Sequence, residues 1–503
     1  MVLAAAIRVY LYFHTSIISL DGAFQFIPIA KLFTEGDFKA ALGHGQLPLY
    51  PILIALVSKT GLDLETSGRL ISLVFSLMTI FPLYFLTKGI FNSKIAFISC
   101  IFFAIHPYFA RFSVDVLKDS LYVFLFIFSI WLGWRALEGK ALFPFLILGV
   151  FGGLTYLTRP DGLEIFLAMV GWILFYQLPR SRKEYVRRAC AFLLLCATIF
   201  ALAVPYILHI HKTTGRWTIS RTKHISALLG QEKDVAQKYF GEAGNLPEKM
   251  GPSVTRRVLP VLYYGVRKAQ NVFHPLLILF FLIGLIARKA IRFQKGELYL
   301  LSFFVLHFTV LYLFIFHYSL WDKGQLIGTH LSGRHFLPSL AISFSWMSAG
   351  FFVINDRTVD WFEKRKPLYS ITHQKVFIII LVIIFGSVLP KTLKSVRSEK
   401  IGRKDIGLWI KNREIAKPLI LTDAPRVAYY AGGTFLRLRR SDYEKNISEA
   451  KVKGIKYIVA QQKNIEKNYP HLIQLAENDF SLQEVPQLAK KGQEKLLIFE
   501  SRF

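Results

Sequence analysis

The stretch RLISLVFSLMTIFPLYFL, residues 69–86, is apolar along almost its whole length. It approaches the roughly 20 apolar residues that a helix needs to cross about 30 Å of hydrocarbon. Similar runs recur at 121–134, 273–286 and 376–389. The chain of 503 residues is 53% hydrophobic, with a mean hydropathy of +0.40. Soluble domains seldom contain such uninterrupted runs, so the sequence predicts a polytopic α-helical membrane protein.

Along the whole chain, hydropathy predicts about eleven transmembrane helices. They are placed at 2–19, 69–87, 95–107, 119–135, 142–157, 162–178, 190–210, 272–287, 298–317, 336–354 and 376–391.

The net charge of +29 sorts between the loops that join these helices. With a cytoplasmic N-terminus, the short inside loops are rich in Lys and Arg, at 88–94, 135–140, 179–188, 287–295 and 356–366. The short outside connections carry few basic residues, which is the positive-inside pattern. We therefore expect a multi-pass protein of the cell (inner) membrane. Its positive charge is expected to interact with the lipid bilayer, and no nucleic-acid partner is expected.

Three polar regions then face outward: the loops 20–68 and 211–271, and the tail from 393 to 503. The second loop is basic, but the positive-inside rule is weak for loops of that length. In the tail, KPLILTD (417–423) and IKYIVA (455–460) predict buried strands. DIGLWIKN (405–412) and SDYEKNISEAKVKG (441–454) have helical spacing, with Gly454 as a helix stop. We expect a membrane domain over 1–392 and an extracytoplasmic α/β domain over 393–503.

Asp21 interrupts SIISLDGAFQFIPIAKLF (16–33) where the first apolar run ends. A carboxylate inside hydrocarbon is costly and usually marks function, and the cost falls at the interface. Asp21 could instead cap the helix that follows, and the two roles are compatible. The next segment, 24–38, has an apolar helical face and predicts an interfacial helix in the first outer loop.

The order of motifs along the chain resembles the GT-C superfamily of membrane glycosyltransferases, which use polyprenyl-phosphate sugars. The similar branch is the group of protein O-mannosyltransferases and lipid A aminoarabinose transferases. Many protein mannosyltransferases have Asp-Glu where this chain has Asp21-Gly22, a departure that weakens protein mannosylation specifically. The matching segments are Asp21, GHGQLPLYPILIALV (43–57), ARFSVDVLKDSLYVFLF (110–126), GLTYLTRPDGL (153–163), PYILHIHKTTGRWTIS (205–220), SGRHFLPSL (332–340) and DAPRVAYYAGG (423–433).

The resemblance implies that Asp21 is the general base of a hexosyl- or pentosyltransferase at the extracytoplasmic face. The expected partners are a polyprenyl-phosphate sugar donor and an acceptor glycan, lipid or protein. In such a transfer an acceptor hydroxyl attacks the anomeric carbon while a carboxylate takes its proton. Cations stabilise the lipid phosphate that leaves.

Four basic residues are candidates for binding the donor phosphate. Arg334 and His335 lie in SGRHFLP at the outer start of a predicted span, and arginine offers a fork of donors suited to phosphate. Snorkelling to lipid headgroups is the alternative for Arg334, and a structural role is the alternative for His335. Arg159 in TRPDG either binds phosphate or pairs with Asp161. Lys118 is the fourth candidate.

A further acidic or acceptor site is predicted around Asp115, Asp119 and His44. If 113–120 is helical, Asp115, Lys118 and Asp119 share one face, either as a surface ion pair or as a second acidic site. Two carboxylates four residues apart are a weak metal signal, so the use of a divalent metal ion stays open. Glycines flank His44 and permit close approach of a ligand, but they are more typical of an ordinary flexible loop.

Two other classes of protein remain as alternatives. A lipid or glycan transporter would place ionisable residues near the bilayer midplane, whereas most notable charges here cluster at the outer boundary. Arg8 within the first span is the exception. A non-catalytic cell-envelope assembly factor would use the C-terminal domain to bind a partner. The sugar, the acceptor and the role of the tail are open at this point.

Overall fold

The computed structural model describes residues 1–176, 181–220, 254–286, 294–317, 319–322, 325–329, 332–365, 372–483 and 494–503. The chain divides into two compact units. One comprises Met1–Leu11 with the described residues of 29–394, and we call it the membrane unit. The other comprises Tyr12–Pro28 with the described residues of 395–503, and we call it the C-terminal unit. Each unit is described by itself.

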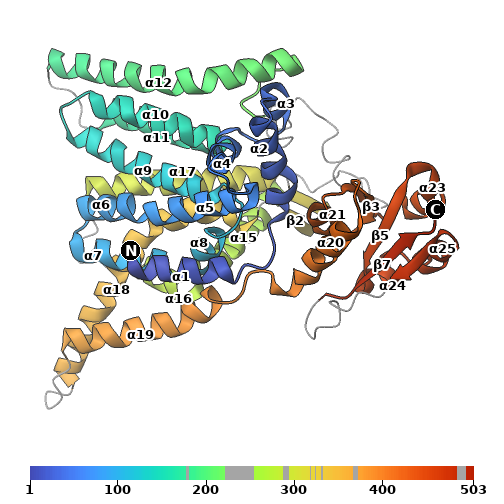
Figure 1. The fold of residues 1–503 in the computed structure, drawn as a ribbon. Coiled ribbons are helices and arrows are strands. Elements are labelled where there is room, and N and C mark those ends of the chain that lie inside the picture. The colour runs from blue at the N-terminus through green and yellow to red at the C-terminus, as the bar shows by residue number, and fades with distance from the viewer. Residues whose placement is uncertain are drawn as a thin grey trace. The chain divides into compact units, whose positions relative to one another are not determined.

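The membrane unit is built almost entirely of helices, most of which run along one common direction (Figure 1). Its helices are α1 (Val2–Phe13), α2 (Ile27–Thr34), α3 (Phe38–Gly43), α4 (Leu49–Ser58), α5 (Leu64–Met78), α6 (Ile80–Ile90), α7 (Ser93–Ile105), α8 (Pro107–Phe112), α9 (Asp119–Glu138), α10 (Phe143–Thr158), η2 (Pro160–Gly162), α11 (Leu163–Phe175), α12 (Arg182–Thr214), α15 (Val254–Phe273), α16 (Pro275–Ile286), α17 (Lys295–His317), η3 (Gly333–Phe336), α18 (Leu337–Arg365) and α19 (His373–Thr392). A short hairpin, β1 (Ser319–Asp322) and β2 (Gln325–Thr329), follows α17.

Six of these segments are long and apolar enough to cross a membrane, which confirms a multi-pass membrane protein. They are Leu64–Ile90, Asp119–Glu138, Arg182–Thr214, Lys295–His317, Gly333–Lys364 and His373–Thr392. The pair α15–α16 qualifies as one span only if its bend is included. Several other apolar helices are shorter, so the count of about eleven stays a prediction.

The bend between α15 and α16 measures 106°. It lies at His274, whose φ of 68° is in the left-handed region that non-glycine residues rarely adopt, directly before Pro275. A proline disfavours helical backbone at the residue before it, so the chain cannot continue α15 straight into α16. The sequence placed 254–271 in an outer loop, and α15 shows that much of this part of the loop is helical.

Helices α16 and α18 approach each other at two glycines. A Cβ on Gly284 would lie 1.9 Å from the Trp346 carbonyl oxygen, and one on Gly350 would lie 1.9 Å from that of Phe280. Small residues permit such contact between membrane helices.

Arg8 of α1 is fully buried. It donates to the Ala104 carbonyl at 3.1 Å, at the C-terminal end of α7 where carbonyls lack helical partners.

The segment predicted to be the first outer loop, 20–68, contains helices, as the sequence predicts. A π-helix, η1 (Gly22–Phe26), follows Asp21 and leads into α2. The side chain of Asp37 caps α3 by accepting from the Ala40 amide, and Asp63 caps α5 in the same way at Thr66.

The C-terminal unit contains a five-stranded sheet of order β4-β3-β5-β7-β6. Strands β3, β4 and β5 are parallel, and β7 is antiparallel to β5 and to β6. The strands and helices of the tail are η4 (Ser398–Lys400), α20 (Ile401–Arg413), β3 (Leu419–Thr422), α21 (Arg426–Ala431), β4 (Thr434–Arg437), α22 (Tyr443–Ser448), α23 (Ala450–Lys453), β5 (Ile455–Gln461), α24 (Gln462–Asn468), α25 (Leu472–Asp479), β6 (Phe480–Gln483) and β7 (Leu496–Ser501).

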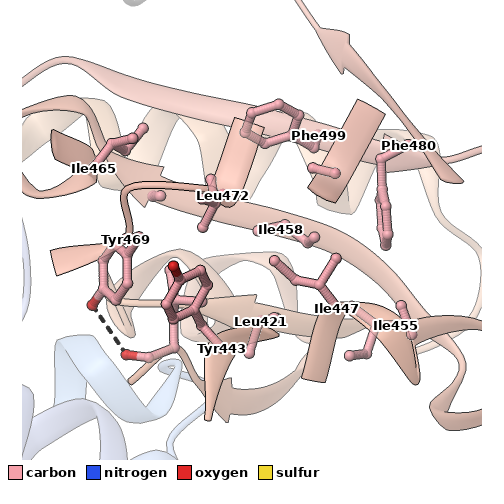
Figure 2. Close-up of a cluster of buried hydrophobic side chains, with 14 residues drawn as sticks. Leu421, Tyr443, Ile447, Ile455, Ile458, Ile465, Tyr469, Leu472, Phe480 and Phe499 are labelled. Carbon is pink, nitrogen blue, oxygen red and sulfur yellow. Dashed lines mark hydrogen bonds between the residues drawn. The ribbon is translucent and has the colours of Figure 1, made fainter. Parts of the chain in front are cut away.

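Alternate residues of β5 feed two cores, one on each face of the sheet. Ile458 points into a cluster with Leu472 and Phe499 (Figure 2), whereas Val459 joins the opposite cluster with α20 and α21. The predicted strands and helices of the tail are confirmed. Gly454 ends α23 with a φ of +67°, as the helix-stop prediction requires.

Some predicted loops lie partly outside the described residues. In the loop 211–271 the residues outside are 221–253, and in the loop 179–188 they are 179–180. In the loop 287–295 they are 287–293, and in the loop 356–366 only residue 366 lies outside.

Candidate functional site

The segment before α9 corrects one expectation from the sequence. Residues 113–118 are not helical, so Asp115, Lys118 and Asp119 do not share a helix face. The Asp115 carboxylate accepts a hydrogen bond from the Val116 amide at 2.9 Å, and the Leu117 amide donates to the Asp115 carbonyl. Short Asp side chains compete in this way for backbone donors that a helix would use. Only Asp119 enters the helix, in the first turn of α9.

Asp119 and Arg159 form a buried ion pair. Arg159 Nη1 lies 3.2 Å from Asp119 Oδ1, and Arg159 Nη2 lies 2.5 Å from Asp161 Oδ2. The guanidinium also covers the Tyr122 ring at 4.7 Å. Burial alone would lower the pKa of Arg159, but Asp161 and Asp119 raise it above its ordinary value. Burial alone would raise the pKa of Asp161, but the Arg159 guanidinium holds it well below its usual range.

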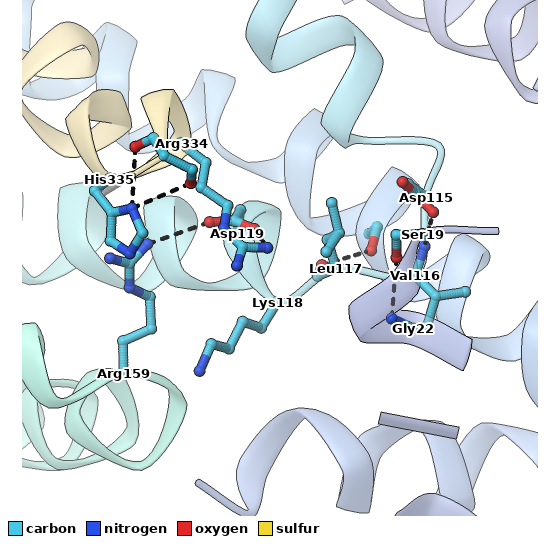
Figure 3. Close-up of polar contacts among 12 residues, drawn as sticks. Ser19, Gly22, Asp115, Val116, Leu117, Lys118, Asp119, Arg159, Arg334 and His335 are labelled. Atoms are coloured by element: carbon cyan, nitrogen blue, oxygen red, sulfur yellow. Dashed lines mark hydrogen bonds and ion pairs between the residues drawn. The ribbon is translucent and has the colours of Figure 1, made fainter. Parts of the chain in front are cut away.

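Arg334 approaches the same carboxylate from η3. Its Nη1 lies 3.9 Å from Asp119 Oδ2, an ion-pair distance beyond that of a hydrogen bond. Figure 3 shows Arg159 and Arg334 converging on Asp119 from different elements. Asp119 is 2% exposed, whereas the Arg334 side chain is 30% exposed. A ligand can therefore reach Arg334 without displacing the buried pair.

Lys118 adds a third cation directly before α9. Its Nζ donates to Gln46 Oε1 at 3.0 Å, which links α9 to the GHGQLP loop. Burial, together with the neighbouring guanidiniums of Arg159 and Arg334, lowers the pKa of Lys118 to about 8. Three cations and two carboxylates thus meet here, with one net positive charge. We call Lys118, Asp119, Arg159, Asp161 and Arg334 the cationic cluster.

The loop that leads into the cationic cluster is held from two other helices. Ser72 Oγ of α5 donates to the Leu117 carbonyl at 3.0 Å, and Tyr50 Oη of α4 lies 3.0 Å from Ser72 Oγ. Tyr50 and Ser72 are fully buried. The tyrosine of the first-loop motif therefore fixes the backbone directly before Lys118.

His307 and Glu164 hold η3 in place. Glu164 Oε2 lies 2.8 Å from His307 Nδ1, and His307 Nε2 donates to the His335 carbonyl at 2.8 Å. That contact requires the proton on Nε2, and Glu164 is 3% exposed while His307 is fully buried. Sequence reasoning missed Glu164 and His307, because lone polar residues in apolar helices carry no motif. It also missed Gln46, although the quoted GHGQLP loop contains it.

Of the remaining predicted site residues, His335 lies beside Arg159 and Arg334 of the cationic cluster (Figure 3). The His335 ring turns back to its own turn, with Nδ1 3.0 Å from the Ser332 carbonyl oxygen. His44 is exposed after α3, and it is Gln46 of the same loop that contacts Lys118. Asp115 is fully buried and bonded to its own segment. Over the described residues, no group of three or more His, Cys, Asp and Glu side chains could hold a metal ion.

Asp21 belongs to the C-terminal unit and is half-buried. It directly precedes η1 but makes no side-chain capping hydrogen bond there. Ser19 does so instead, since its Oγ accepts from the Gly22 amide at 3.0 Å (Figure 3). Helix capping therefore does not account for the carboxylate.

The structure resembles solved membrane glycosyltransferases. The oligosaccharyltransferase of Archaeoglobus fulgidus in complex with Zn and sulfate matches with a TM-score of 0.57 and 15% identity over 97% of this chain and 72% of that chain. ArnT from Cupriavidus metallidurans in the apo state matches with a TM-score of 0.56 and 12% identity over 99% and 97%. Mycobacterial arabinofuranosyltransferase AftD matches with a TM-score of 0.52 and 13% identity over 99% and 41%.

The fold is that of GT-C membrane glycosyltransferases, which confirms the resemblance seen in the sequence. Residues 44–209 also match the family model described as dolichyl-phosphate-mannose-protein mannosyltransferase. No curated protein sequence matches the chain. The family-model match over part of the chain and the shared fold agree with the glycosyltransferase that the sequence predicts.

Proposed function

We propose that this protein transfers one sugar from a polyprenyl-phosphate donor to an acceptor hydroxyl on the extracytoplasmic face of the membrane. The observation that carries the proposal is the accessible guanidinium of Arg334 beside the buried Asp119–Arg159 pair, with Lys118 next to it. A site with net positive charge suits an anionic phosphate. ArnT from Cupriavidus metallidurans, a structural neighbour with a TM-score of 0.55, has been solved bound to undecaprenyl phosphate.

In the proposed reaction, the acceptor oxygen attacks the anomeric carbon as the bond from that carbon to the phosphate oxygen breaks. The bonding electrons leave with the polyprenyl phosphate, whose negative charge Arg334 and Lys118 stabilise. Asp21 is the general base that takes the acceptor proton. Attack opposite the leaving phosphate inverts the anomeric centre. Arg159 pairs with Asp119 and holds this side chain in place beside Arg334.

The acceptor is a hydroxyl of a protein, a lipid or a glycan. In this proposal the donor binds to the predicted membrane domain, 1–392, and the α/β domain, 393–503, lies outside the membrane.

Purified full-length protein incubated with radiolabelled polyprenyl-phosphate sugars tests the proposal. The panel contains mannose, glucose and aminoarabinose donors, and solubilised membranes of the source cells supply acceptors. We expect one donor to release its lipid phosphate as its label enters the acceptor fraction. Asp21→Asn should lower the transfer rate by about 10²–10⁴-fold but keep binding of undecaprenyl phosphate, whereas Arg334→Ala should weaken both.

The two alternatives give different results. A transporter would bind the lipid without breaking the sugar–phosphate bond. Neither the unsubstituted protein nor Asp21→Asn would then release lipid phosphate. A non-catalytic assembly factor would tolerate both substitutions. Retention of full transfer activity by Asp21→Asn would refute Asp21 as the base.

A further inference from the structure

The segment that carries Asp21 is fastened to the C-terminal domain through its backbone. The Val396 amide donates to the His14 carbonyl at 3.2 Å, and the Ser16 amide donates to the Val396 carbonyl at 3.3 Å. Arg397 Nη1 donates to the Ile17 carbonyl at 3.0 Å. All these residues belong to the C-terminal unit, although almost 400 residues of chain separate them.

Two further contacts form a clamp on Ile18, three residues before Asp21. The Ile18 amide donates to Tyr430 Oη at 3.0 Å, and the Ile18 carbonyl accepts from Arg426 Nε at 2.7 Å. Ile18 is fully buried and Arg426 is 6% exposed. Two side chains of α21 thus satisfy both backbone groups of one residue, a buried arrangement that is costly to break.

The clamp is mounted on a rigid part of the domain. Helix α21 packs against α20 so closely that a Cβ on Gly407 would lie 2.7 Å from the Val427 carbonyl oxygen. Val427 is fully buried in the core that α20 and α21 form with the sheet. Beyond Asp21, the Phe24 ring packs against that of Phe435 at 5.4 Å. Asp21 is therefore bracketed by contacts to the domain on both sides along the chain.

We infer that the C-terminal α/β domain is a positioning element for Asp21, with Arg426 and Tyr430 as the positioning residues. This inference rests on the proposed function, in which Asp21 is the general base. A base must lie within hydrogen-bond reach of the proton that it takes. The inference assigns a role to the DAPRVAYYAGG motif (423–433), whose Arg and second Tyr form the clamp.

Hydrogen exchange on the full-length protein in detergent tests the clamp without any substrate. In Arg426→Gln with Tyr430→Phe, we expect the amides of 15–24 to exchange about tenfold faster or more, because local protection reports local opening. The amides of β5 should keep their protection, which shows that the domain remains folded. Arg413→Gln is the matched control, since it removes an arginine of the same domain that contacts Glu500 and the Trp409 ring. Unchanged exchange over 15–24 in the double variant would overturn the clamp.

Donor turnover then tests whether the clamp serves Asp21. For the donor that the panel above identifies, the double variant should lower kcat by about 10²-fold, the loss that a misplacement of about 1 Å causes. The KM for the donor should stay within about twofold, because the phosphate site is untouched. Arg426→Lys, which keeps a donor, should restore part of kcat.

A double-mutant cycle separates failure of the inference from failure of the proposed function. In an Asp21→Asn background, the clamp variants should cause no further loss of kcat. The side-chain amide of the substituted residue cannot act as a base, so its position no longer affects the rate. If Asp21→Asn is impaired and the clamp variants lower its residual transfer rate by a further factor of similar size, the clamp acts elsewhere and the inference is wrong. If Asp21→Asn is fully active, the proposed function fails first.

Discussion

Arg159 and Asp119 lie 40 residues apart in the chain and form a buried ion pair with 3.2 Å between nitrogen and oxygen. Arg159 follows the last residue of α10, and Asp119 begins α9. A carboxylate in the first turn of a helix also meets the positive end of the helix dipole. The pair therefore joins the end of α10 to the start of α9, and Arg334 lies beside it.

Asp119→Asn should destabilise the protein more than an ordinary charge removal. Breaking one side of a buried ion pair costs about 3–5 kcal/mol, and we expect the lower part of this range because Asp161 still pairs with Arg159. The apparent free energy of unfolding in detergent measures the effect. Glu35→Gln is the control, because it removes an exposed pair with Lys31 and should cost less than about 1 kcal/mol. Equal losses in the two variants would contradict a structural role for the pair.

Binding of undecaprenyl phosphate should weaken as the pH rises through about 8. The pKa of Lys118 is lowered to about 8 by burial and by the guanidiniums of Arg159 and Arg334, so the ammonium loses its proton above that pH. Asp119 and Asp161 partly oppose this shift, and Gln46 only accepts from the ammonium. The phosphate itself, with a second pKa near 6, does not titrate in this range.

Binding titrations from pH 7 to 9.5 check this pH dependence. Since a charge-assisted hydrogen bond contributes about 1.5–3 kcal/mol, we expect about a tenfold loss of affinity or more. Lys118→Met should bind weakly at pH 7 and show a flat profile. A flat profile in the unsubstituted protein would remove Lys118 from the phosphate site.

His307→Phe should impair phosphate binding although His307 is remote from the accessible surface. The substitution leaves the Glu164 carboxylate and the His335 carbonyl without their buried partner, which costs about 1–3 kcal/mol for each unsatisfied group. With η3 released, Arg334 should bind undecaprenyl phosphate more weakly. His307→Gln, which can still donate to the His335 carbonyl, should recover part of the affinity. Failure of His307→Gln to recover more affinity than His307→Phe would contradict the positioning role.

Gly162→Ala should disrupt the turn that carries Arg159 and Asp161. A Cβ at position 162 would lie 2.5 Å from the Thr155 carbonyl carbon, which is backbone and cannot move aside. Such overpacking typically costs about 1–3 kcal/mol, and we expect lost thermal stability and lost phosphate binding together. Gly171→Ala is the matched control, because it faces open space in α11 and should stabilise slightly or do nothing. A fully stable, binding-competent Gly162→Ala protein would show that the turn tolerates displacement.

Hydropathy predicted the helical membrane architecture because each long span is a continuous apolar run, as at 69–86. The tail was predictable because β5 alternates between two cores and Gly454 ends a helix. The conformation of 113–118 was not predictable, since Asp115 uses a local backbone donor that helical spacing does not reveal. Arg159 and Arg334 were identified from motifs, but their convergence on Asp119 depends on how α9, α10 and η3 pack. Glu164 and His307 became visible only through that packing.

Asp119 has a consequence for the catalytic cycle of an enzyme of the proposed kind. One of its oxygens accepts no hydrogen bond from the described residues and lies 3.9 Å from Arg334. It is a resident anion, and any incoming lipid must compete with it for the same guanidinium. When a bound phosphate leaves Arg334, the guanidinium still has the Asp119 carboxylate as a counter-charge.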